Sequence, residues 1–241
     1  MSSVDARTEI FRSSWSLYDA IIGMNYMFHR EIESTVGQVI RGIGERGDYS
    51  VLDLGCGNAR GLSNPLRAMP PRRYVGVDLS RPALDQAAEE LKALPSVDLR
   101  EQDMLASVEE LGGQSRAFDL IHSAFAMHHL SASDKARLFR AMSRMLTSAG
   151  ISLLVDVVRD VGQSREAYLA DYLGMVDAEW TRLSAEQIGQ VRDHVSAFDY
   201  PETLEALVRM ARDAGFEEAR TLARHRQHHV ILFQRRRGGT E

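Results

Sequence analysis

Cysteine is almost missing from this chain, since Cys56 is the only one among its 241 residues. A single cysteine excludes a disulfide within the chain and fits a reducing compartment, so we expect a cytoplasmic protein. Long apolar runs are missing as well. None approaches the roughly 18 to 20 residues that cross a bilayer, and the N-terminus has no apolar signal core. We therefore expect neither a membrane span nor a secretory signal.

Positive charge is also in short supply. The chain has 29 Lys and Arg against 34 Asp and Glu, a formal net charge of -5 and a pI near 5.9. A protein that tracks a nucleic-acid backbone normally carries a basic surface, so no nucleic-acid partner is expected. The hydrophobic fraction of 44% and the charged fraction of 26% are ordinary for a globular protein. The length suits one substantial α/β domain with a modest addition.

The most informative run is V-L-D-L-G-C-G-N-A-R, Val51 to Arg60, in which a strand reaches an acid and two glycines precede a helix. Gly55 and Gly57 lack a Cβ, so the backbone turns tightly and approaches a ligand closely, while the N–H groups that open the helix face it. The run resembles the cofactor loop of the class I S-adenosylmethionine-dependent methyltransferases. By that resemblance, Asp53 receives the ammonium group of the methionine part, directly or through water.

Two glycines alone do not separate this loop from that of a nicotinamide-binding Rossmann domain, which has a third glycine three residues further on. Arg60 occupies that position here, and Asp53 stands two residues before the first glycine, as in the methyltransferases. Asp78 closes the strand-like run Tyr74 to Asp78, where an acid is placed to bind ribose hydroxyls. Both kinds of cofactor use that contact, so Asp78 indicates a nucleotide cofactor without choosing between them.

The next two strand-like runs favour the methyltransferase. The third ends at Asp103 and Met104, which match the family's acid that accepts from the adenine amino group and the residue that covers the ring. The fourth, Phe118 to Ala124, leads into F-A-M-H-H-L, then an amphipathic stretch and the apolar strand Ile151 to Val158. This order and spacing resemble the family from about residue 49 to 158.

The resemblance implies a Rossmann-like, doubly wound α/β sheet of seven strands, mostly parallel with an antiparallel last strand, and S-adenosyl-L-methionine as the cofactor. The expected cofactor-binding residues are Asp53, Gly55, Cys56, Gly57, Asp78, Leu79, Asp103, Met104 and Ser123, with Tyr18 and Tyr26 from the N-terminal segment. The two tyrosines are eight residues apart and so lie nearly on one face of a helix. An aromatic ring near the sulfonium and core packing are equal alternatives for them.

Two helical segments exceed what the sheet needs. Residues 1–48 contain a helical stretch from about residue 9 to 43, and an insertion at about residues 160–200 interrupts the domain of residues 49–241 with two more helices. Open α/β sheets bind ligands beyond the carboxyl ends of their strands, so an insertion after the fifth strand emerges beside the methyl group. We expect both segments to form a lid over the acceptor.

Histidines are the candidate bases. His128 and His129 follow the fourth strand, where one would line the acceptor pocket; the alternative is that both only shape the loop and cap the next helix. His194 belongs to the expected lid and His29 to the N-terminal helix, where a hydrogen bond at a packing seam is the simpler explanation. Methyl transfer from a sulfonium is an in-line displacement, so a base is needed only where the acceptor loses a proton.

This chain lacks the residues that several kinds of methyltransferase require. Enzymes acting on the amino groups of nucleic-acid bases carry an N/D-P-P-Y loop after the fourth strand, where this chain has Ser123 to Ala126. The metal-dependent catechol type needs acids there and an Asp-Asn pair after the fifth strand, where Asp156 and Val157 stand, so no metal is expected. Cytosine C5 methylation needs a nucleophilic cysteine outside the cofactor loop, and this chain has none. A small-molecule acceptor remains, with a homodimer left open.

Three functions remain as hypotheses: a small-molecule methyltransferase acting on a metabolite or natural product, an enzyme using the cofactor for other chemistry, and a non-catalytic cofactor-binding subunit. A carboxy-S-adenosylmethionine synthase, the example of the second, also has an N-terminal helix with tyrosines, but it needs a pocket arginine, for which Arg12 and Arg159 are the candidates. A non-catalytic subunit would be expected to lose Asp78 or a loop glycine, and both are intact. The first is favoured.

Overall fold

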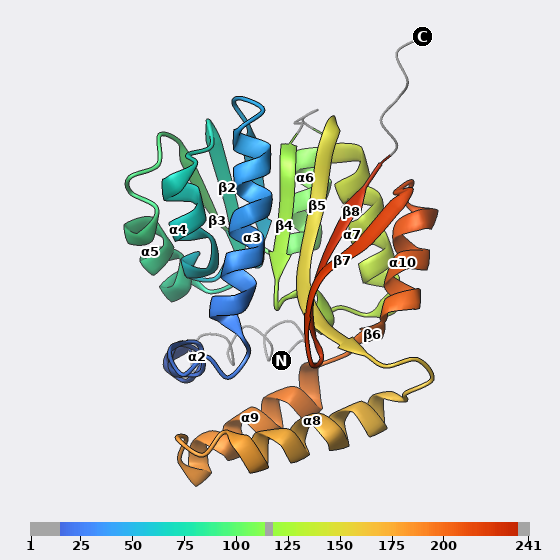
Figure 1. Ribbon diagram of the computed structural model, residues 1–241. Coiled ribbons are helices and arrows are strands. Elements are labelled where there is room, and N and C mark those ends of the chain that lie inside the picture. Colours follow the sequence, from blue (N-terminus) through green and yellow to red (C-terminus); the bar gives the residue numbers. More distant parts are fainter. Residues whose placement is uncertain (1–14, 114–117, 236–241) are drawn as a thin grey trace.

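A mixed sheet runs through the middle of the structure, a computed structural model that describes residues 15–113 and 118–235 (Figure 1). Its strands are β1 (Ser50–Leu54), β2 (Arg73–Asp78), β3 (Val97–Glu101), β4 (Phe118–Ala124), β5 (Leu146–Arg159), β6 (Glu202–Thr203), β7 (Glu218–His225) and β8 (His228–Gln234). Their order is β3-β2-β1-β4-β5-β8-β7, with β6 paired to β5. Among these strands β8 is antiparallel to β5 and β7, and the other pairings are parallel. The expected fold class is confirmed, with the two-residue β6 as an addition.

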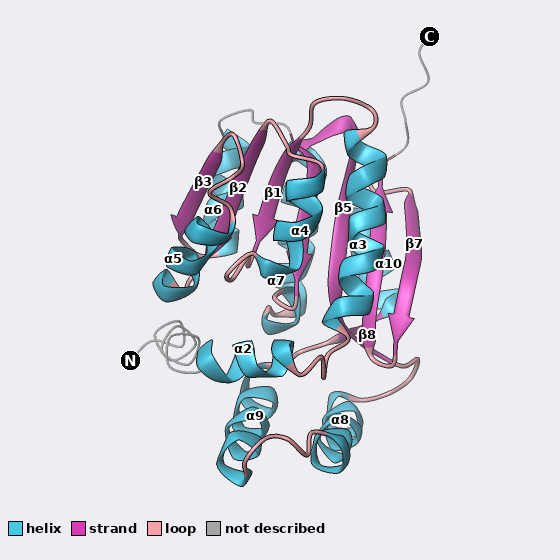
Figure 2. Ribbon diagram, turned by 60° about the vertical axis from the view of Figure 1, so that its left-hand side comes forward, coloured by secondary structure: helices cyan, strands magenta, loops and turns pink. Residues whose placement is uncertain are grey.

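Helices cover both faces of this sheet (Figure 2). One face carries α3 (His29–Gly44), α4 (Arg60–Ala68) and α5 (Arg81–Glu90), and the other carries α6 (Met104–Gly113), α7 (Ala132–Met145) and α10 (Leu204–Asp213). Three further helices, α2 (Trp15–Gly23), α8 (Arg165–Glu179) and α9 (Ala185–Phe198), lie beyond the edge at which the parallel strands end. That edge is where open α/β sheets bind their ligands.

The central strands are buried on both faces, which explains why they read as continuous apolar runs. All five residues of β1 are buried, and one apolar cluster lies on each side of the sheet. In α7 the buried Leu138, Met142 and Met145 recur at helical spacing and pack against the sheet. Within residues 15–113 and 118–235, no helix combines the length and apolarity needed to cross a membrane.

A third apolar cluster joins the extra helices to one another and to the sheet. It contains Leu17 and Ile21 of α2, residues of α8 and α9, Trp180 between those helices, and Val157 of β5. We call α2, α8 and α9 the lid. Because the lid helices bury their apolar faces in a shared core, they pack as one body over the sheet edge.

The prediction of one helix from about residue 9 to 43 is wrong, because the structure has two helices there. The first, α2, ends at Gly23, and α3 begins at His29. Residues 9–14 lie outside the described residues. In the break, Asn25 and Phe28 both have φ of 59°, which ends a right-handed helix. The Asn25 side chain holds the turn, because its Oδ1 accepts from Arg30 N at 3.0 Å and its Nδ2 donates to Glu31 at 2.9 Å.

The two helices expected in the insertion form, and serine caps set where they begin. Ser164 Oγ accepts from Ala167 N at 3.1 Å at the start of α8. Ser184 and Gln187 form a reciprocal capping box at the start of α9. Each cap satisfies N–H groups that have no partner within the helix, so these local signals fix where α8 and α9 start.

Phe233 of β8 supports the core between the sheet and α7. Its side chain is fully buried and makes edge contacts with Phe139 at 5.1 Å and Phe216 at 6.0 Å between ring centroids. We expect Phe233→Ala to lower the free energy of unfolding by about 3 to 5 kcal/mol, because it leaves a cavity in a packed core. Urea denaturation measures this. Val161→Ala, at a side chain that is 77% exposed, is the control and should change stability by less than about 0.5 kcal/mol. Equal midpoints for the two variants would contradict the prediction.

Candidate active site

A cavity of about 580 Å³ opens between the carboxyl edge of the sheet and the lid. Its walls come from the loops after β1, β2, β3 and β4, from α3 and α4, and from α2, α8 and α9. Its volume lies within the range of small-molecule and cofactor pockets, roughly 300 to 1,000 Å³. One continuous space therefore reaches from the glycine loop to the lid.

The glycine loop after β1 needs its glycines for two reasons. Gly55 and Gly57 have φ of 73° and 52°, in the left-handed region that glycine adopts at little cost. A Cβ on Gly55 would also collide with the Cβ of Ala126 from the loop after β4. The backbone N–H groups of Gly55 and Cys56 donate to Val77 O at 2.8 and 3.0 Å, which ties this loop to the end of β2.

Asp78 ends β2 and lines the cavity. Its Oδ2 accepts from Gly57 N and its Oδ1 from Ser80 N, both at 2.8 Å. Burial raises the pKa of Asp78, and these two backbone N–H groups act against that rise. Each carboxylate oxygen has a second lone pair, so a ligand hydroxyl can still donate to it.

Asp103, Met104, Cys56 and Leu79 line the same part of the cavity. Asp103 caps α6, since its Oδ1 accepts from Leu105 N at 2.9 Å and Ala106 N at 3.2 Å. Cys56 is partly buried beside Asp53 and Asp78, and desolvation together with these two acids raises the pKa of its thiol. The thiol therefore stays protonated and inert, in keeping with the role of a small filler in the loop.

Asp53 is buried at the end of β1, and both of its oxygens are engaged by side chains. Its Oδ2 accepts from the Tyr74 hydroxyl and its Oδ1 contacts His122 Nδ1, each at 2.8 Å. Neither partner was predicted from the sequence, although the pairing of β1 with β4 places Asp53 directly beside His122. Asp53 lines the cavity, so an ammonium group there would share oxygens that Tyr74 and His122 already hold.

Two expected cofactor contacts, Ser123 and Tyr26, are not among the described residues that line the cavity. The Ser123 hydroxyl instead donates to Leu54 O at 2.8 Å, where β1 ends. Tyr26 stacks on Trp180 at 5.0 Å between ring centroids, and its hydroxyl accepts from Arg182 N at 2.9 Å. Tyr26 thus links the N-terminal segment to the connection between α8 and α9. Tyr18 does line the cavity, where burial raises the pKa of its hydroxyl.

His128 and His129 form the 3₁₀ helix η1 (Met127–His129), and both line the cavity. His128 is buried, with its Nδ1 2.5 Å from Asp156 Oδ1 and its backbone N donating to Asp156 Oδ2 at 2.9 Å. Because Asp156 is in the middle of β5, the strand fixes the orientation of the His128 ring. His194 of α9 lies beside the pair, with its ring edge-on to His129 at 5.2 Å.

Asp199, directly after α9, closes this group. Its Oδ1 lies 3.5 Å from His128 Nε2 and 3.6 Å from His129 Nδ1. Burial raises the pKa of Asp199 to about 6. Burial alone would lower the pKa of His128, but the carboxylates of Asp156 and Asp199 raise it above its ordinary value. Neither acid could be assigned to this group from the sequence, because neither neighbours the histidines along the chain.

His29 reaches the cavity from the start of α3. It lies 5.2 Å from Phe125 and 6.3 Å from Tyr18 between ring centroids. Burial lowers the pKa of His29 to about 4, so the ring is neutral. Among the described residues neither of its ring nitrogens has a hydrogen-bond partner, although both are buried. A bound molecule with a donor or an acceptor is the natural partner for them.

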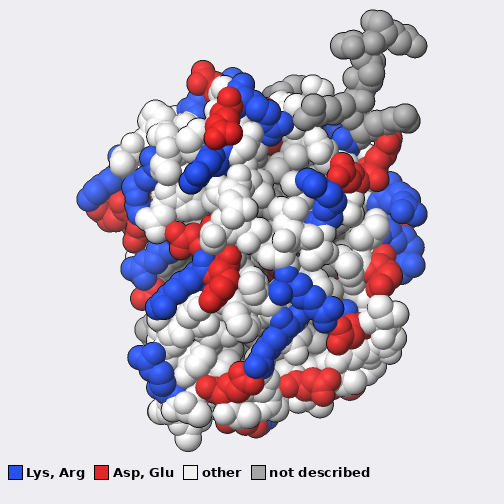
Figure 3. All heavy atoms as spheres, in the orientation of Figure 1, with Lys and Arg blue, Asp and Glu red and all other residues white. Residues whose placement is uncertain are grey.

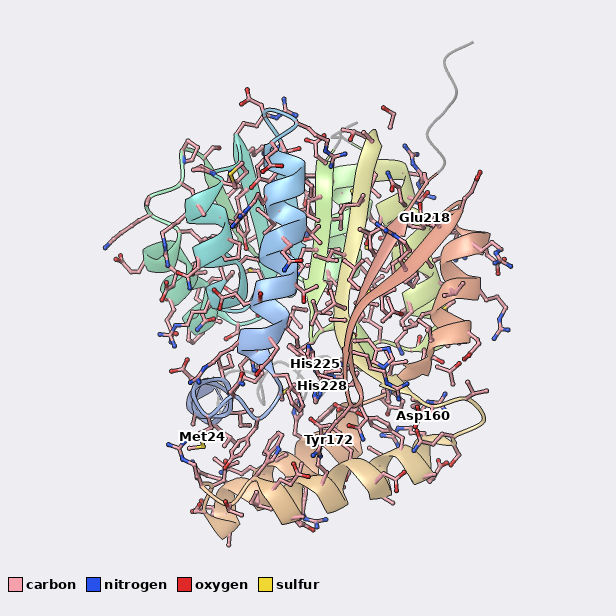
Figure 4. All side chains as sticks on the ribbon, in the orientation of Figure 1. Met24, Asp160, Tyr172, Glu218, His225 and His228 are labelled. Atoms are coloured by element: carbon pink, nitrogen blue, oxygen red, sulfur yellow. The ribbon has the colours of Figure 1, made fainter. Side chains whose placement is uncertain are left out.

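Figure 4 shows Tyr172 of α8 near His225 and His228 at the turn between β7 and β8. The rings of Tyr172 and His228 are 6.1 Å apart, and Tyr172 also lines the cavity.

The lid half of the cavity is mainly apolar, and its lining includes Leu17, Ile21, Tyr172, Trp180, Val191 and Val195. On the outer face shown in Figure 3, acidic and basic side chains are intermixed.

Comparison with known proteins agrees with this geometry. The family model for a methyltransferase domain matches residues 51–150. An uncharacterized methyltransferase from Synechocystis sp. (strain ATCC 27184 / PCC 6803 / Kazusa) is 27% identical over 145 residues, which cover 59% of this chain and 64% of that protein. The match therefore spans less than two thirds of the relative's length.

Solved structures are similar in fold over nearly the whole chain. An O-methyltransferase family protein from Burkholderia thailandensis has a TM-score of 0.67 at 16% identity, over 95% of this chain and 62% of that one. Magnesium protoporphyrin IX methyltransferase from Synechocystis PCC 6803 with bound SAM has a TM-score of 0.65 at 12% identity, over 98% of both chains. The DhpI–SAH complex also scores 0.65, at 13% identity over 96% of both chains. These TM-scores establish a shared fold.

We expect Asp78→Ala to weaken the binding of S-adenosylhomocysteine by about 1 to 3 kcal/mol, because the change removes an acceptor from the cavity and leaves the N–H of Gly57 unsatisfied. Isothermal titration calorimetry measures the affinity. The control is Asp85→Ala, at an exposed acid of α5 that pairs with Arg81 outside the cavity. An affinity equal to that of the control would remove Asp78 from the cofactor contacts.

The lowered pKa of His29 predicts that the protein loses stability in acid. Its pKa is about 4 in the folded protein against an ordinary 6.5, so below pH 6.5 the unfolded chain binds the proton more readily. The stabilisation is complete above pH 6.5 and is lost as the pH falls toward 4, with a contribution on the order of 3 kcal/mol. We expect the free energy of unfolding to fall less between pH 7 and pH 4.5 in His29→Phe than in the unmodified protein. Identical pH dependence of the two proteins in urea denaturation would contradict this.

Proposed function

We propose that this chain, which belongs to the class I S-adenosylmethionine-dependent methyltransferase superfamily, transfers the methyl group of its cofactor to a small-molecule acceptor under the lid. One observation carries the proposal: a single cavity of about 580 Å³ joins the glycine loop to the apolar lid half. Two ligands that must react with each other need such a shared, water-excluding space.

The two halves of the cavity differ in chemistry. The sheet half offers the loop of Gly55 and Gly57 with the acids Asp78 and Asp103, which suit the amino acid, ribose and adenine parts of the cofactor. The lid half offers apolar and aromatic side chains with the neutral rings of His29 and His194, which suit a largely uncharged acceptor. The acceptor atom would then approach the methyl carbon from the side opposite the sulfur, as in-line transfer requires.

The histidines indicate where the reacting atom of the acceptor lies. His128, His129 and His194 converge at one wall of the cavity, and His29 faces it from α3. In our proposal the first three activate a proton-bearing group of the acceptor, and the neutral ring of His29 orients the molecule by a hydrogen bond. Similar proteins with names that indicate O-methylation or a porphyrin substrate support a small acceptor by analogy alone.

The extra segments fit this division of labour. We assign α2 and the insertion at about residues 160–200 to the lid. The sequence predicted all of residues 1–48 as a lid segment, but α3 buries its apolar side chains against the sheet, so we assign it with residues 49–159 and 201–241 to the methyltransferase domain. Support comes from the third apolar cluster, in which α2, α8 and α9 pack together over the sheet edge. Tyr26 strengthens that contact through its stacking on Trp180.

The other two hypotheses find less support. The arginine required by a carboxy-S-adenosylmethionine synthase is not supplied by Arg159, which donates from Nε to Pro201 O at 2.7 Å and pairs with Glu202. Arg12 lies outside the described residues. A subunit that only binds cofactor would not need the buried histidine and acid group on the lid side.

The proposal is tested by incubating the protein with S-adenosylmethionine carrying a labelled methyl group and fractions of a metabolite extract. We expect label in a small molecule, with one S-adenosylhomocysteine formed per methyl group transferred. Label found in protein or nucleic acid instead would overturn the choice of acceptor. Binding of the cofactor with no labelled product from any fraction would favour the non-catalytic subunit.

We expect Val195→Phe to reduce turnover by at least tenfold while S-adenosylhomocysteine affinity changes by less than about twofold. Val195 is a buried residue of α9 that lines the lid half of the cavity, so a larger side chain fills space meant for the acceptor. Ala197→Phe, at an exposed position of the same helix, is the matched control and should keep full turnover. A parallel loss of cofactor affinity in Val195→Phe would show that Val195 borders the cofactor instead.

A further inference from the structure

Three side-chain atoms that can bind a metal ion lie close together on the lid side of the cavity. Ligand atoms of His128, His129 and Asp199 all lie within 4.8 Å of one another. Asp199 Oδ1 is 3.5 Å from His128 Nε2 and 3.6 Å from His129 Nδ1. A charge-assisted hydrogen bond would draw such atoms to about 2.7 to 2.9 Å. In a tetrahedral site with metal–ligand bonds of about 2.0 to 2.1 Å, neighbouring ligand atoms are about 3.3 Å apart. The two distances from Asp199 Oδ1 are close to that value. His129 Nδ1 also lies 3.2 Å from Phe198 O, a contact that a metal ion bound to Nδ1 would replace.

Asp199 supplies a second, independent observation. Its side chain is buried, and among the described residues its Oδ1 has no hydrogen-bond partner. A buried carboxylate oxygen without a partner is costly, so its position calls for a cation or a donor that completes the group. The oxygen faces the two histidine nitrogens in a wall of the cavity, where an added ligand can reach it.

The surroundings of His128 match those of a metal-binding histidine. Its Nδ1 donates to Asp156 Oδ1 at 2.5 Å, which leaves Nε2 as the atom that faces Asp199. A histidine that binds a metal through one nitrogen commonly donates from the other to a carboxylate.

We propose that His128 Nε2, His129 Nδ1 and Asp199 Oδ1 bind one divalent first-row transition-metal ion, with Asp156 orienting His128 and an open coordination position facing the cavity. Two histidines and one carboxylate with an open position form a known type of metal centre. This inference rests on the proposed function only for the reaction of the ion, not for its binding. It revises the expectation of a metal-free site, which considered the acids of the catechol type alone.

The ion would bind an acceptor that carries a hydroxyl group. A metal lowers the pKa of a bound hydroxyl, so its proton leaves to water and the oxygen stays on the metal as the nucleophile. That oxygen forms a bond to the methyl carbon as the bond between carbon and sulfur breaks, and the electron pair of the broken bond remains on sulfur. The products are the methyl ether and neutral S-adenosylhomocysteine, so the site predicts O-methylation.

Cobalt titration of the untagged, chelator-treated protein tests the site without the acceptor. We expect one equivalent of Co²⁺ to bind with a visible absorption band, and Zn²⁺ to displace it. His129→Gln and Asp199→Asn should each weaken Co²⁺ binding about a hundredfold or more, and Asp156→Asn about 10- to 100-fold because it acts through His128. His29→Gln, in the same cavity but outside the group, is the matched control and should keep the affinity. S-adenosylhomocysteine binding in each variant verifies that the fold and the cofactor site are intact.

Each result decides between the metal site and the alternatives. No saturable Co²⁺ binding, together with methyl transfer that persists in excess chelator, would overturn the metal site and leave the proposed function standing. Binding that His129→Gln and Asp199→Asn leave unchanged would place the ion elsewhere and also overturn it. Binding that follows the expected order, without a labelled small-molecule product, would keep the metal site and count against the proposed function.

Discussion

The parallel pairing of β1 with both β2 and β4 is the constraint on which the rest of this structure depends. It brings the carboxyl ends of neighbouring strands to one edge, so that Asp53, Asp78 and His122 lie within reach of the same cavity. The glycine loop can turn back over β2 because Gly55 has the left-handed conformation and no Cβ. Any chain that lost this pairing would lose the cavity with it.

Buried carboxylates are the second organising feature. Asp53 is held by Tyr74 and His122, and Asp156 by His128, so each acid is compensated by a neighbour from another strand or loop. Burying an unpaired charge is costly, which explains why these groups come as sets. Asp199 differs, since its Oδ1 accepts no hydrogen bond among the described residues and has the ring nitrogens of His128 and His129 only at 3.5 and 3.6 Å.

In the proposed function, the lid determines which acceptor meets the cofactor. It is built from two distant parts of the chain that share one apolar core, and the cavity lies between that core and the sheet. The lid half of the cavity is therefore shaped by side chains such as Trp180 and Val195. These residues lie far from the glycine loop along the chain and belong to no motif that includes it. Proteins with this fold can keep the sheet half and change the acceptor by changing the lid.

The sequence by itself determined the sheet and which strand-end residues, among them Gly55, Asp78 and Asp103, line the cavity at its edge. Apolar runs, the glycine pair and the acids at the ends of strands are local signals, and each acts through the backbone that carries it. Tertiary structure alone decided the rest. Asp199 reaches His128 from 71 residues away, Tyr26 turns toward Trp180 instead of the cavity, and Ser123 bonds to β1. No local pattern encodes these contacts, because they depend on how separate elements pack after the sheet has formed.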